Sequence, residues 1–274
     1  MRSRALIGGA VAAVALALSA TSVHAIRYGE PDNDEHPYVG LMVAYSEADD
    51  GTLTRLWRCS GTLLDETHYL TAGHCTYGAD HVEIWFGEDL RDAAAINYPG
   101  GPGDASGTPY AHPDYDDAAF YLNDLGMVVL DAPYEETNGE FGALPEQGYL
   151  DQFFVRRGQN KQLFTAVGYG LQRNMPEPTG LTSAERVRLQ ATLRIINQDA
   201  AFGEKKTGNS VLFTNNASGG GTCNGDSGGP IFVEGSNVVA AVTSYGLNAR
   251  CAGTGGGYRV DQPDDLAWLA TFGL

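Results

Sequence analysis

Basic residues are scarce in this chain, and their scarcity limits the partners it can have. The 274 residues include 17 lysines and arginines against 34 aspartates and glutamates, for a formal net charge of −17. A chain this acidic repels the phosphates of nucleic acids and of anionic membranes. We therefore expect no nucleic acid partner, and we attribute the charge to solubility.

Long apolar runs are missing after the first 25 residues, which excludes a later membrane-spanning helix. Residues 1–4 are Met-Arg-Ser-Arg, residues 5–20 are apolar, and residues 23–25 are Val-His-Ala. A basic start, an apolar run shorter than the ~20 residues of a membrane span, and small residues before a cut indicate a signal peptide. We predict a signal peptide over 1–25 and one secreted domain over 26–274, free of the membrane after cleavage.

Cysteine is also rare. The four cysteines are Cys59, Cys75, Cys223 and Cys251. An even number in an exported chain predicts two disulfides, and three pairings are possible. Metal ligation is the alternative, but the chain has no C-x-x-C spacing to support it. We expect no metal and no cofactor.

The chain has no internal repeats and no low-complexity tails. Short apolar and β-branched runs recur between breaks rich in glycine and aspartate, a pattern that predicts an all-β barrel or sandwich. Pro263-Asp264-Asp265 precedes an apolar segment and predicts a short C-terminal helix. The expected strands cover residues 81–86, 127–130, 163–167, 187–196, 230–233 and 238–244, and the expected loops cover 98–108 and 217–221.

One glycine-rich loop, Gly225-Asp226-Ser227-Gly228-Gly229-Pro230, indicates a nucleophile. Its glycines permit a tight turn that can aim successive backbone N–H groups at an acyl oxyanion, although a plain surface turn is the alternative. The Gly-x-Ser-x-Gly spacing also fits an α/β-hydrolase, which needs a histidine after its serine. None of the six histidines follows Ser227, so that fold is excluded and the base must lie upstream.

Three segments, in this order, resemble the signature motifs of chymotrypsin-like serine proteases. They are residues 71–75 (Thr-Ala-Gly-His-Cys), 123–130 (Asn-Asp-Leu-Gly-Met-Val-Val-Leu) and 223–230 (Cys-Asn-Gly-Asp-Ser-Gly-Gly-Pro). The resemblance runs from about Ile26 to the C-terminus. It implies two six-stranded antiparallel β-barrels that meet near residues 135–150. The active site would lie in the cleft between the barrels, and the C-terminal helix would pack on the second.

The resemblance also implies roles for individual residues. Ser227 would be the nucleophile, His74 its general base, and Asp124 the carboxylate that orients the imidazole. Gly225 and Ser227 would donate backbone N–H groups to the oxyanion. Ser244 would support Asp124 from behind. The implied disulfides are Cys59–Cys75 and Cys223–Cys251.

The implied substrate pocket comprises Gly221, Thr222, Ser244, Gly246 and Gly256. Gly221 would form its floor, where relatives specific for arginine or lysine carry aspartate, and Gly246 and Gly256 would form its walls. An open and uncharged pocket follows, which favours large apolar or aromatic residues over basic ones. Position 243 carries histidine in glutamate-specific relatives; Thr243 there counts against acidic specificity.

Signal cleavage after Ala25 would make Ile26 the N-terminus. In the enzymes that this chain resembles, a new N-terminal ammonium pairs with the aspartate before the serine, which here is Asp226. Export would then activate the enzyme, although Arg27 and Tyr28 depart from the usual Val-Gly.

We therefore expect a secreted, monomeric serine endopeptidase that acts on proteins or peptides. A non-catalytic binding protein on the same fold and an esterase with the same triad are the alternatives. Calcium binding stays open, because Asp80, Glu83, Glu88 and Asp89 lack a diagnostic ligand spacing.

Overall fold

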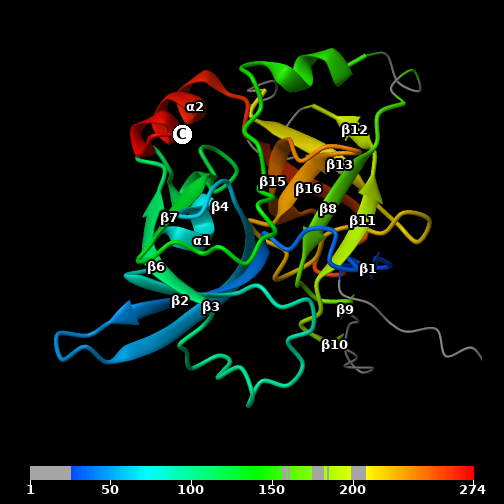
Figure 1. The fold of residues 1–274 in the computed structure, drawn as a ribbon. Coiled ribbons are helices and arrows are strands. Elements are labelled where there is room, and N and C mark those ends of the chain that lie inside the picture. The colour runs from blue at the N-terminus through cyan, green and yellow to red at the C-terminus, as the bar shows by residue number, and fades with distance from the viewer. Residues whose placement is uncertain (1–25, 156–158, 160, 175–181, 184, 199–207) are drawn as a thin grey trace, which may run out of the picture.

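The computed structural model describes residues 26–155, 159, 161–174, 182–183, 185–198 and 208–274, and it is mostly β-structure (Figure 1). The predicted signal peptide, residues 1–25, lies outside the described residues. In the part of the chain that is described, no helix has the length and apolar character needed to cross a bilayer.

The first structural unit is a closed six-stranded barrel, as the resemblance implied. Its neighbouring strands are all antiparallel, and α1 (Gly73–Thr76) follows β4 directly. In order around the barrel the strands are β2 (Val39–Glu47), β3 (Leu53–Leu63), β4 (His68–Thr71), β7 (Gly126–Leu130), β6 (Ala105–Ala111) and β5 (His81–Trp85).

The second unit is an eight-stranded sheet that curves as a half-barrel; among the described residues its edges do not close on each other. It has eight strands instead of the expected six because short strands, β1 and β12, extend its two ends. In sheet order the strands are β1 (Glu30–Pro31), β11 (Leu189–Leu193), β8 (Phe164–Gly168), β14 (Pro230–Val233), β15 (Val239–Gly246), β16 (Gly253–Arg259), β13 (Ser210–Asn215) and β12 (Ile195–Asn197).

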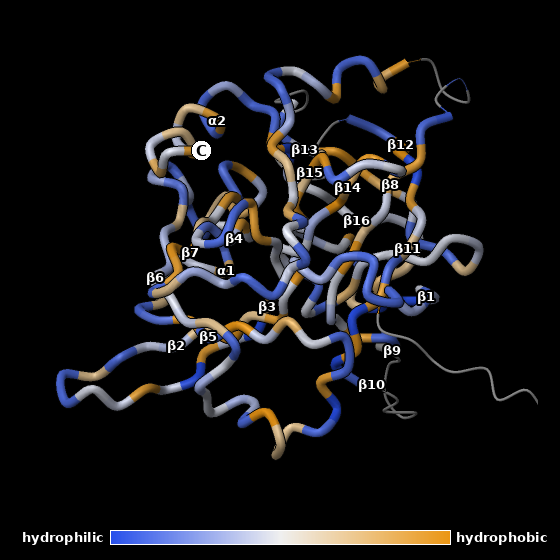
Figure 2. The backbone as a smooth tube through the Cα atoms, in the orientation of Figure 1, coloured by the Kyte–Doolittle hydropathy of each residue, from blue (hydrophilic) through white to orange (hydrophobic). Residues whose placement is uncertain are grey.

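Several short elements complete the chain. Strands β9 (Arg173–Asn174) and β10 (Thr182–Ser183) pair as a separate ribbon, and two 3₁₀ helices, η1 (Asp117–Ala119) and η2 (Tyr149–Phe153), lie in connections. The larger apolar cluster fills the first barrel with residues such as Leu41 and Leu70 and extends into the second unit, where it includes Phe232, Val242 and Tyr258. A second, smaller cluster, which includes Phe164 and Phe213, lies within the second unit. Figure 2 shows short hydrophobic stretches in the strands of both units.

The C-terminal helix α2 (Pro263–Leu269) forms where the sequence predicted it, and the 3₁₀ helix η3 (Ala270–Phe272) follows it. Helix α2 contacts both units rather than the second barrel alone. The Tyr258 hydroxyl of β16 donates to Asp265 at 2.8 Å, and Leu269 belongs to the larger apolar cluster, which contains residues of both units. Beside the first barrel, the Trp268 ring meets His112 edge-on with the ring centroids 5.1 Å apart. Figure 1 accordingly shows α2 beside β4 and β7.

The predicted loop over 98–108 ends earlier than expected, because β6 begins at Ala105. Gly107 reads as a loop residue in the sequence, but in the barrel it pairs with Leu130 of β7. A side chain there would place its Cβ 2.5 Å from the carbonyl oxygen of Val129, so the close approach of two strands requires glycine.

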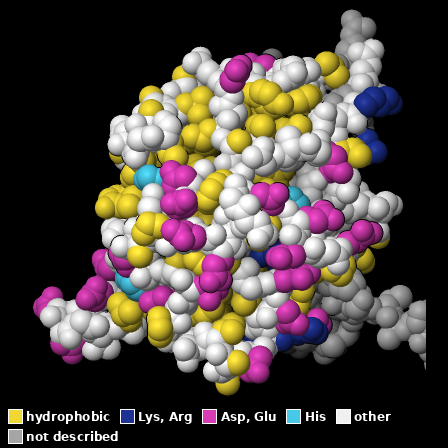
Figure 3. Space-filling model, in the orientation of Figure 1, with side chains coloured by type: hydrophobic (Ala, Val, Ile, Leu, Met, Phe, Trp, Pro, Cys, Tyr) yellow, Lys and Arg dark blue, Asp and Glu magenta, His cyan; other side chains and the backbone are white. Residues whose placement is uncertain are grey.

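Acidic side chains are scattered over the face of the molecule seen in Figure 3, and few basic ones accompany them. This distribution follows from the excess of 34 acidic over 17 basic residues. The negative charge is therefore a property of the general surface rather than of one element.

Candidate active site

His74 and Asp124 are brought together by the register of the first barrel. Thr71 of β4 pairs with Gly126 of β7; His74 follows the first strand and Asp124 precedes the second. The imidazole Nδ1 lies 3.0 Å from both carboxylate oxygens of Asp124, and the backbone N–H of His74 donates to Oδ1 at 2.8 Å. Two separate bonds therefore hold the histidine against the carboxylate.

Asp124 is fully buried, and its second oxygen accepts a hydrogen bond of 2.5 Å from the Ser244 hydroxyl at the end of β15. Burial alone would lower the pKa of His74. The charge and hydrogen bond of Asp124, helped by the charge of Asp117, outweigh burial and raise that pKa above its ordinary value. The arrangement thus stabilises the imidazolium that a general base becomes.

The Ser227 loop packs directly on the segment of chain that leads into His74. Gly225 and Gly228 have positive φ angles of 96° and 75°, the left-handed region that favours glycine. A Cβ on Gly228 would lie 2.0 Å from Thr71 Oγ1 and 2.8 Å from the Ala72 amide nitrogen. The loop therefore reaches the histidine segment only because residue 228 has no side chain.

Ser60 of β3 holds the Ser227 loop through hydrogen bonds, a role that the sequence analysis missed. Its hydroxyl donates to the Gly225 carbonyl oxygen at 2.9 Å, and its amide donates to the Ser227 carbonyl oxygen at 2.8 Å. The same hydroxyl accepts from the Tyr169 amide at 3.1 Å. Its position directly after Cys59 is the one local signal that could have drawn attention to it.

The backbone amides of the loop divide into two groups. Those of Asp226, Gly228 and Gly229 donate to carbonyl oxygens of the protein. Within the described part of the chain, the amides of Gly225 and Ser227 donate to no protein acceptor. These two N–H groups are the ones that an oxyanion would need.

Both disulfides implied by the resemblance are present, Cys59–Cys75 beside the histidine loop and Cys223–Cys251 beside the serine loop. The donor atoms of Cys59, Cys75 and His74 lie within 4.8 Å of one another, which on geometry alone could suggest a metal site. The two sulfurs are bonded to each other, so neither is a thiolate that could bind an ion.

The four carboxylates considered for calcium have separate partners. Glu47 donates its amide to Asp80, Gly103 donates its amide to Glu83, and Asp89 pairs with Arg91. Asn33 donates its amide to Glu88 at 2.9 Å. These carboxylates form no common group among the described residues.

Asp226, next to Ser227, is a fully buried carboxyl group. Burial raises its pKa to about 7, although the amides of Cys223 and Gly170 donate to it at 2.8 and 2.7 Å and the charge of Arg58 acts in the opposite direction. Gly168 and Gly170 leave the space that it fills. Ile26 is fully buried in the second apolar cluster, and its α-nitrogen is part of the peptide bond to Ala25.

The structure places an aromatic ring against one of the two glycines expected to form the pocket walls. A Cβ on Gly256 would lie 2.2 Å from Cε2 of Tyr245, so the Tyr245 ring rests directly on the glycine expected to form one wall. Tyr245 is 9% exposed, whereas Gly246, the other wall, is exposed. The space beside Gly256 therefore holds an aromatic ring of the protein itself.

The floor of the implied pocket contains Asn215, which the sequence analysis also missed. A Cβ on Gly221 would lie 2.3 Å from Cγ and 2.4 Å from Oδ1 of Asn215. The Asn215 amide nitrogen donates to the Thr222 carbonyl oxygen at 2.7 Å. A local turn brings this asparagine beneath Gly221, because the backbones of Asn216 and Gly220 exchange two hydrogen bonds across it.

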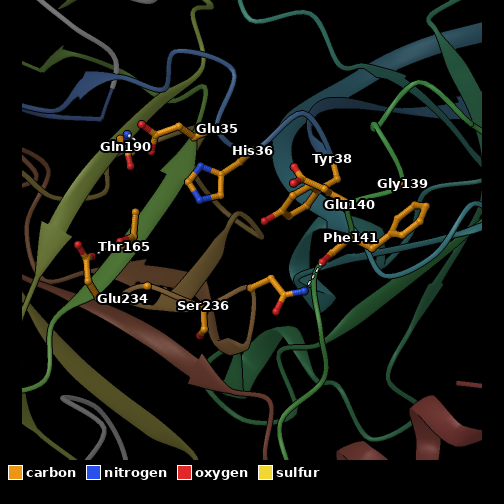
Figure 4. A pocket seen from close by; sticks show the side chains of 12 residues that line it. Glu35, His36, Tyr38, Gly139, Glu140, Phe141, Thr165, Gln190, Glu234 and Ser236 are labelled. Carbon is orange, nitrogen blue, oxygen red and sulfur yellow. Dashed lines mark hydrogen bonds between the residues drawn. The ribbon is translucent and has the colours of Figure 1, made fainter.

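A separate hollow of about 570 Å³ lies at the junction of the two units and is lined by three glutamates, Glu35, Glu140 and Glu234 (Figure 4). His36 lines it too, with Nδ1 2.6 Å from Asp32. This second histidine–aspartate pair differs from the first, because the buried Arg188 guanidinium also binds Asp32 at 2.8 Å. The pair is part of an ion network beneath the N-terminal segment.

A family model described as Trypsin matches residues 31–264 of the chain. The chain is 29% identical over 235 residues to a trypsin of Saccharopolyspora erythraea, a match that covers 84% of this chain and 90% of the relative. It is 28% identical over 251 residues to a collagenase of Hypoderma lineatum, with 86% and 87% covered.

A solved structure, titled HL collagenase at 1.7 Å resolution, superposes with a TM-score of 0.67. The superposition covers 92% of this chain and 99% of the other at 19% sequence identity. At that identity the likeness shows the shared fold.

Proposed function

Because the chain belongs to the trypsin family and is a serine-type endopeptidase, we propose that Ser227, His74 and Asp124 form its catalytic triad. The observation that carries this proposal is a chain of hydrogen bonds that links Ser244, Asp124 and His74. The loop that holds Ser227 packs beside it, on the segment that leads into His74. Asp124 and Ser244 act by positioning the imidazole and holding its charge.

The reaction would proceed through an acyl-enzyme. As Ser227 Oγ bonds to the scissile carbonyl carbon, His74 Nε2 takes the hydroxyl proton. The same nitrogen then protonates the leaving amine while the carbon–nitrogen bond breaks. Water enters, gives its proton to His74 and attacks the ester, and the proton returns to Ser227 as the acid product leaves.

The amides of Gly225 and Ser227 would bind the negative oxygen that forms in each step. Their lack of protein acceptors within the described residues supports this role, since a donor already bonded to a carbonyl would have to break that bond first. Losing one such donor costs roughly 10²–10³ in turnover.

The primary pocket would prefer large apolar or aromatic residues before the cut. No carboxylate stands at Gly221 to neutralise a basic side chain. Gly246 and Gly255, which pair across β15 and β16, carry no side chains and would leave room for a large residue.

We further propose that the enzyme is exported by its first 25 residues and acts as a monomer on proteins or peptides. Cleavage after Ala25 would free the Ile26 ammonium to pair with Asp226, the buried carboxyl beside the nucleophile. A buried carboxylate without a cation is costly, so the new terminus would stabilise the active loop.

Labelling by a sulfonyl fluoride tests the triad. Wild-type protein should lose activity with one label on Ser227, and His74→Ala protein should label far more slowly. A non-catalytic binding protein would stay unlabelled. Parallel peptide and ester assays distinguish a peptidase from an esterase, and cleavage-site profiling on a denatured protein reads the preference.

A further inference from the structure

Asn215 carries a buried acceptor that has no partner among the described residues. The residue ends β13 and is 2% exposed, and its Oδ1 accepts no hydrogen bond from this part of the chain. Its amide nitrogen is satisfied by the Thr222 carbonyl oxygen at 2.7 Å, which fixes the orientation of the carboxamide. Burying an acceptor without a hydrogen-bond partner costs free energy of folding, so we expect this acceptor to have a function.

The surroundings of this oxygen are built from residues without side chains. A Cβ on Gly221 would lie 2.4 Å from Asn215 Oδ1, so the carboxamide occupies the space that a floor side chain would otherwise fill. A Cβ on Gly255, next to the wall residue Gly256, would lie 3.0 Å from Thr222 Oγ1 and 3.9 Å from Asn215 Nδ2. The floor is thus polar and uncharged. Gly256, the next residue along β16, is the wall glycine that the Tyr245 ring contacts.

We propose that Asn215 determines specificity: its Oδ1 accepts a hydrogen bond from the tip of the substrate side chain, and the enzyme therefore prefers tyrosine to phenylalanine before the cut. This inference rests on the proposed function and narrows its substrate class. Tyrosine combines a large ring, for which the paired glycines Gly246 and Gly255 leave room, with a neutral donor at its far end. A lysine or arginine would also donate, but the neutral carboxamide supplies no charge to offset the burial of a cation.

Matched peptide substrates that differ only in the residue before the cut test the inference. Phenylalanine, tyrosine and O-methyltyrosine form a series in which only tyrosine carries a donor at the ring tip. We expect kcat/KM of the wild-type enzyme to be about 2- to 10-fold higher for tyrosine than for phenylalanine, which is the range of one net hydrogen bond. O-methyltyrosine should lose that advantage.

Asn215→Leu removes the acceptor at nearly constant volume and should bring the tyrosine-to-phenylalanine ratio to about 1 while phenylalanine is still cleaved. Ser210→Ala is the matched control, because Ser210 Oγ is also buried without a partner but lies at the opposite end of β13. It should leave the ratio unchanged.

A wild-type enzyme that cleaves tyrosine and phenylalanine substrates equally well would overturn the role of Asn215, even if Asn215→Leu fails to fold. Failure of the proposed function looks different. In that case none of the three substrates is cleaved and Ser227 takes no sulfonyl label.

Discussion

Ser244 and Asp124 are joined by a 2.5 Å hydrogen bond between the second unit and the first barrel, at the point where Asp124 holds His74. The bond crosses the junction of the two sheets, and one apolar cluster contains residues of both, such as Leu70 and Val242. The geometry of the candidate site therefore depends on how the two units dock as well as on each unit by itself.

Ser244→Ala should reduce kcat/KM by about tenfold, because a hydrogen bond to a buried charged group is worth roughly 1.5–3 kcal/mol and Asp124 would lose one of its donors. Steady-state kinetics on one peptide substrate measure the effect. Ser236→Ala is the control, since the Ser236 hydroxyl donates to the Val233 carbonyl oxygen and accepts from the Val238 amide, and neither group belongs to the candidate site. Equal activity of the two variants would contradict a positioning role for Ser244.

Ser227→Ala and His74→Ala should each reduce kcat by about 10⁴–10⁶, and the double variant should be little worse than either. The serine cannot act without the base and the base has nothing else to activate, so the two losses overlap. Active-site titration of all three proteins corrects for contamination. Multiplicative losses in the double variant would refute the assignment of these residues to one catalytic unit.

Gly228→Ala should destabilise the protein by about 2–5 kcal/mol, because it adds a left-handed alanine and also a Cβ that would lie 2.0 Å from Thr71 Oγ1. Gly235→Ala is a matched control with a φ of 78° and nothing within 4 Å, and should cost only about 1 kcal/mol. Urea unfolding in a Ser227→Ala background avoids self-digestion. Similar losses in both variants would show that the contact with Thr71 does not matter.

Gly221→Asp alone should fail to create a functional basic-residue protease, because its Cβ would lie 2.3 Å from Asn215 Cγ. Combining it with Asn215→Ala removes Cγ and Oδ1 but leaves the Asn215 Cα 2.7 Å from the new Cβ, so preference should shift only partly toward arginine and lysine. Competition between arginyl and tyrosyl peptides measures the shift. Strong arginine preference in the wild-type enzyme would show that Gly221 is not the pocket floor.

The protonation of the buried Asp226 carboxyl should make the stability of the uncleaved protein depend on pH. Its folded pKa of about 7 lies above the ordinary value of 3.8, so the folded state binds the extra proton between these two pH values. Stability should therefore fall as pH rises from about 4 to 7, and it should fall less once cleavage supplies the Ile26 ammonium.

Urea unfolding at several pH values tests this with two Ser227→Ala proteins, one beginning at Ile26 and one extended by two alanines. Asp226→Asn in the extended protein should remove the pH dependence that Asp226 contributes to the free energy of unfolding. Identical pH profiles for the two forms, or full activity in an extended Ser227 enzyme, would rule out pairing between Ile26 and Asp226.

The sequence by itself determined the class of fold, the two disulfides and the catalytic candidates. Strand runs such as 230–233 could be located because alternation and glycine breaks are local signals, and β14 covers the same residues. His74, Asp124 and Ser227 stand in short motifs whose order excluded the α/β-hydrolase reading. Residue types and spacings predicted an all-β chain with two disulfides, and the resemblance of three motifs to a known family implied the disulfide pairing and the catalytic roles.

Tertiary structure decided what lies next to what across long stretches of chain. Ser244 reaches Asp124, Tyr245 covers Gly256 and α2 contacts both units through pairings and packing that no local pattern encodes. Specificity depends on such contacts, because a pocket is formed by surfaces from several strands at once. Gly221 and Gly256 have no side chains, and only the tertiary structure determines which neighbouring side chains occupy the space beside them.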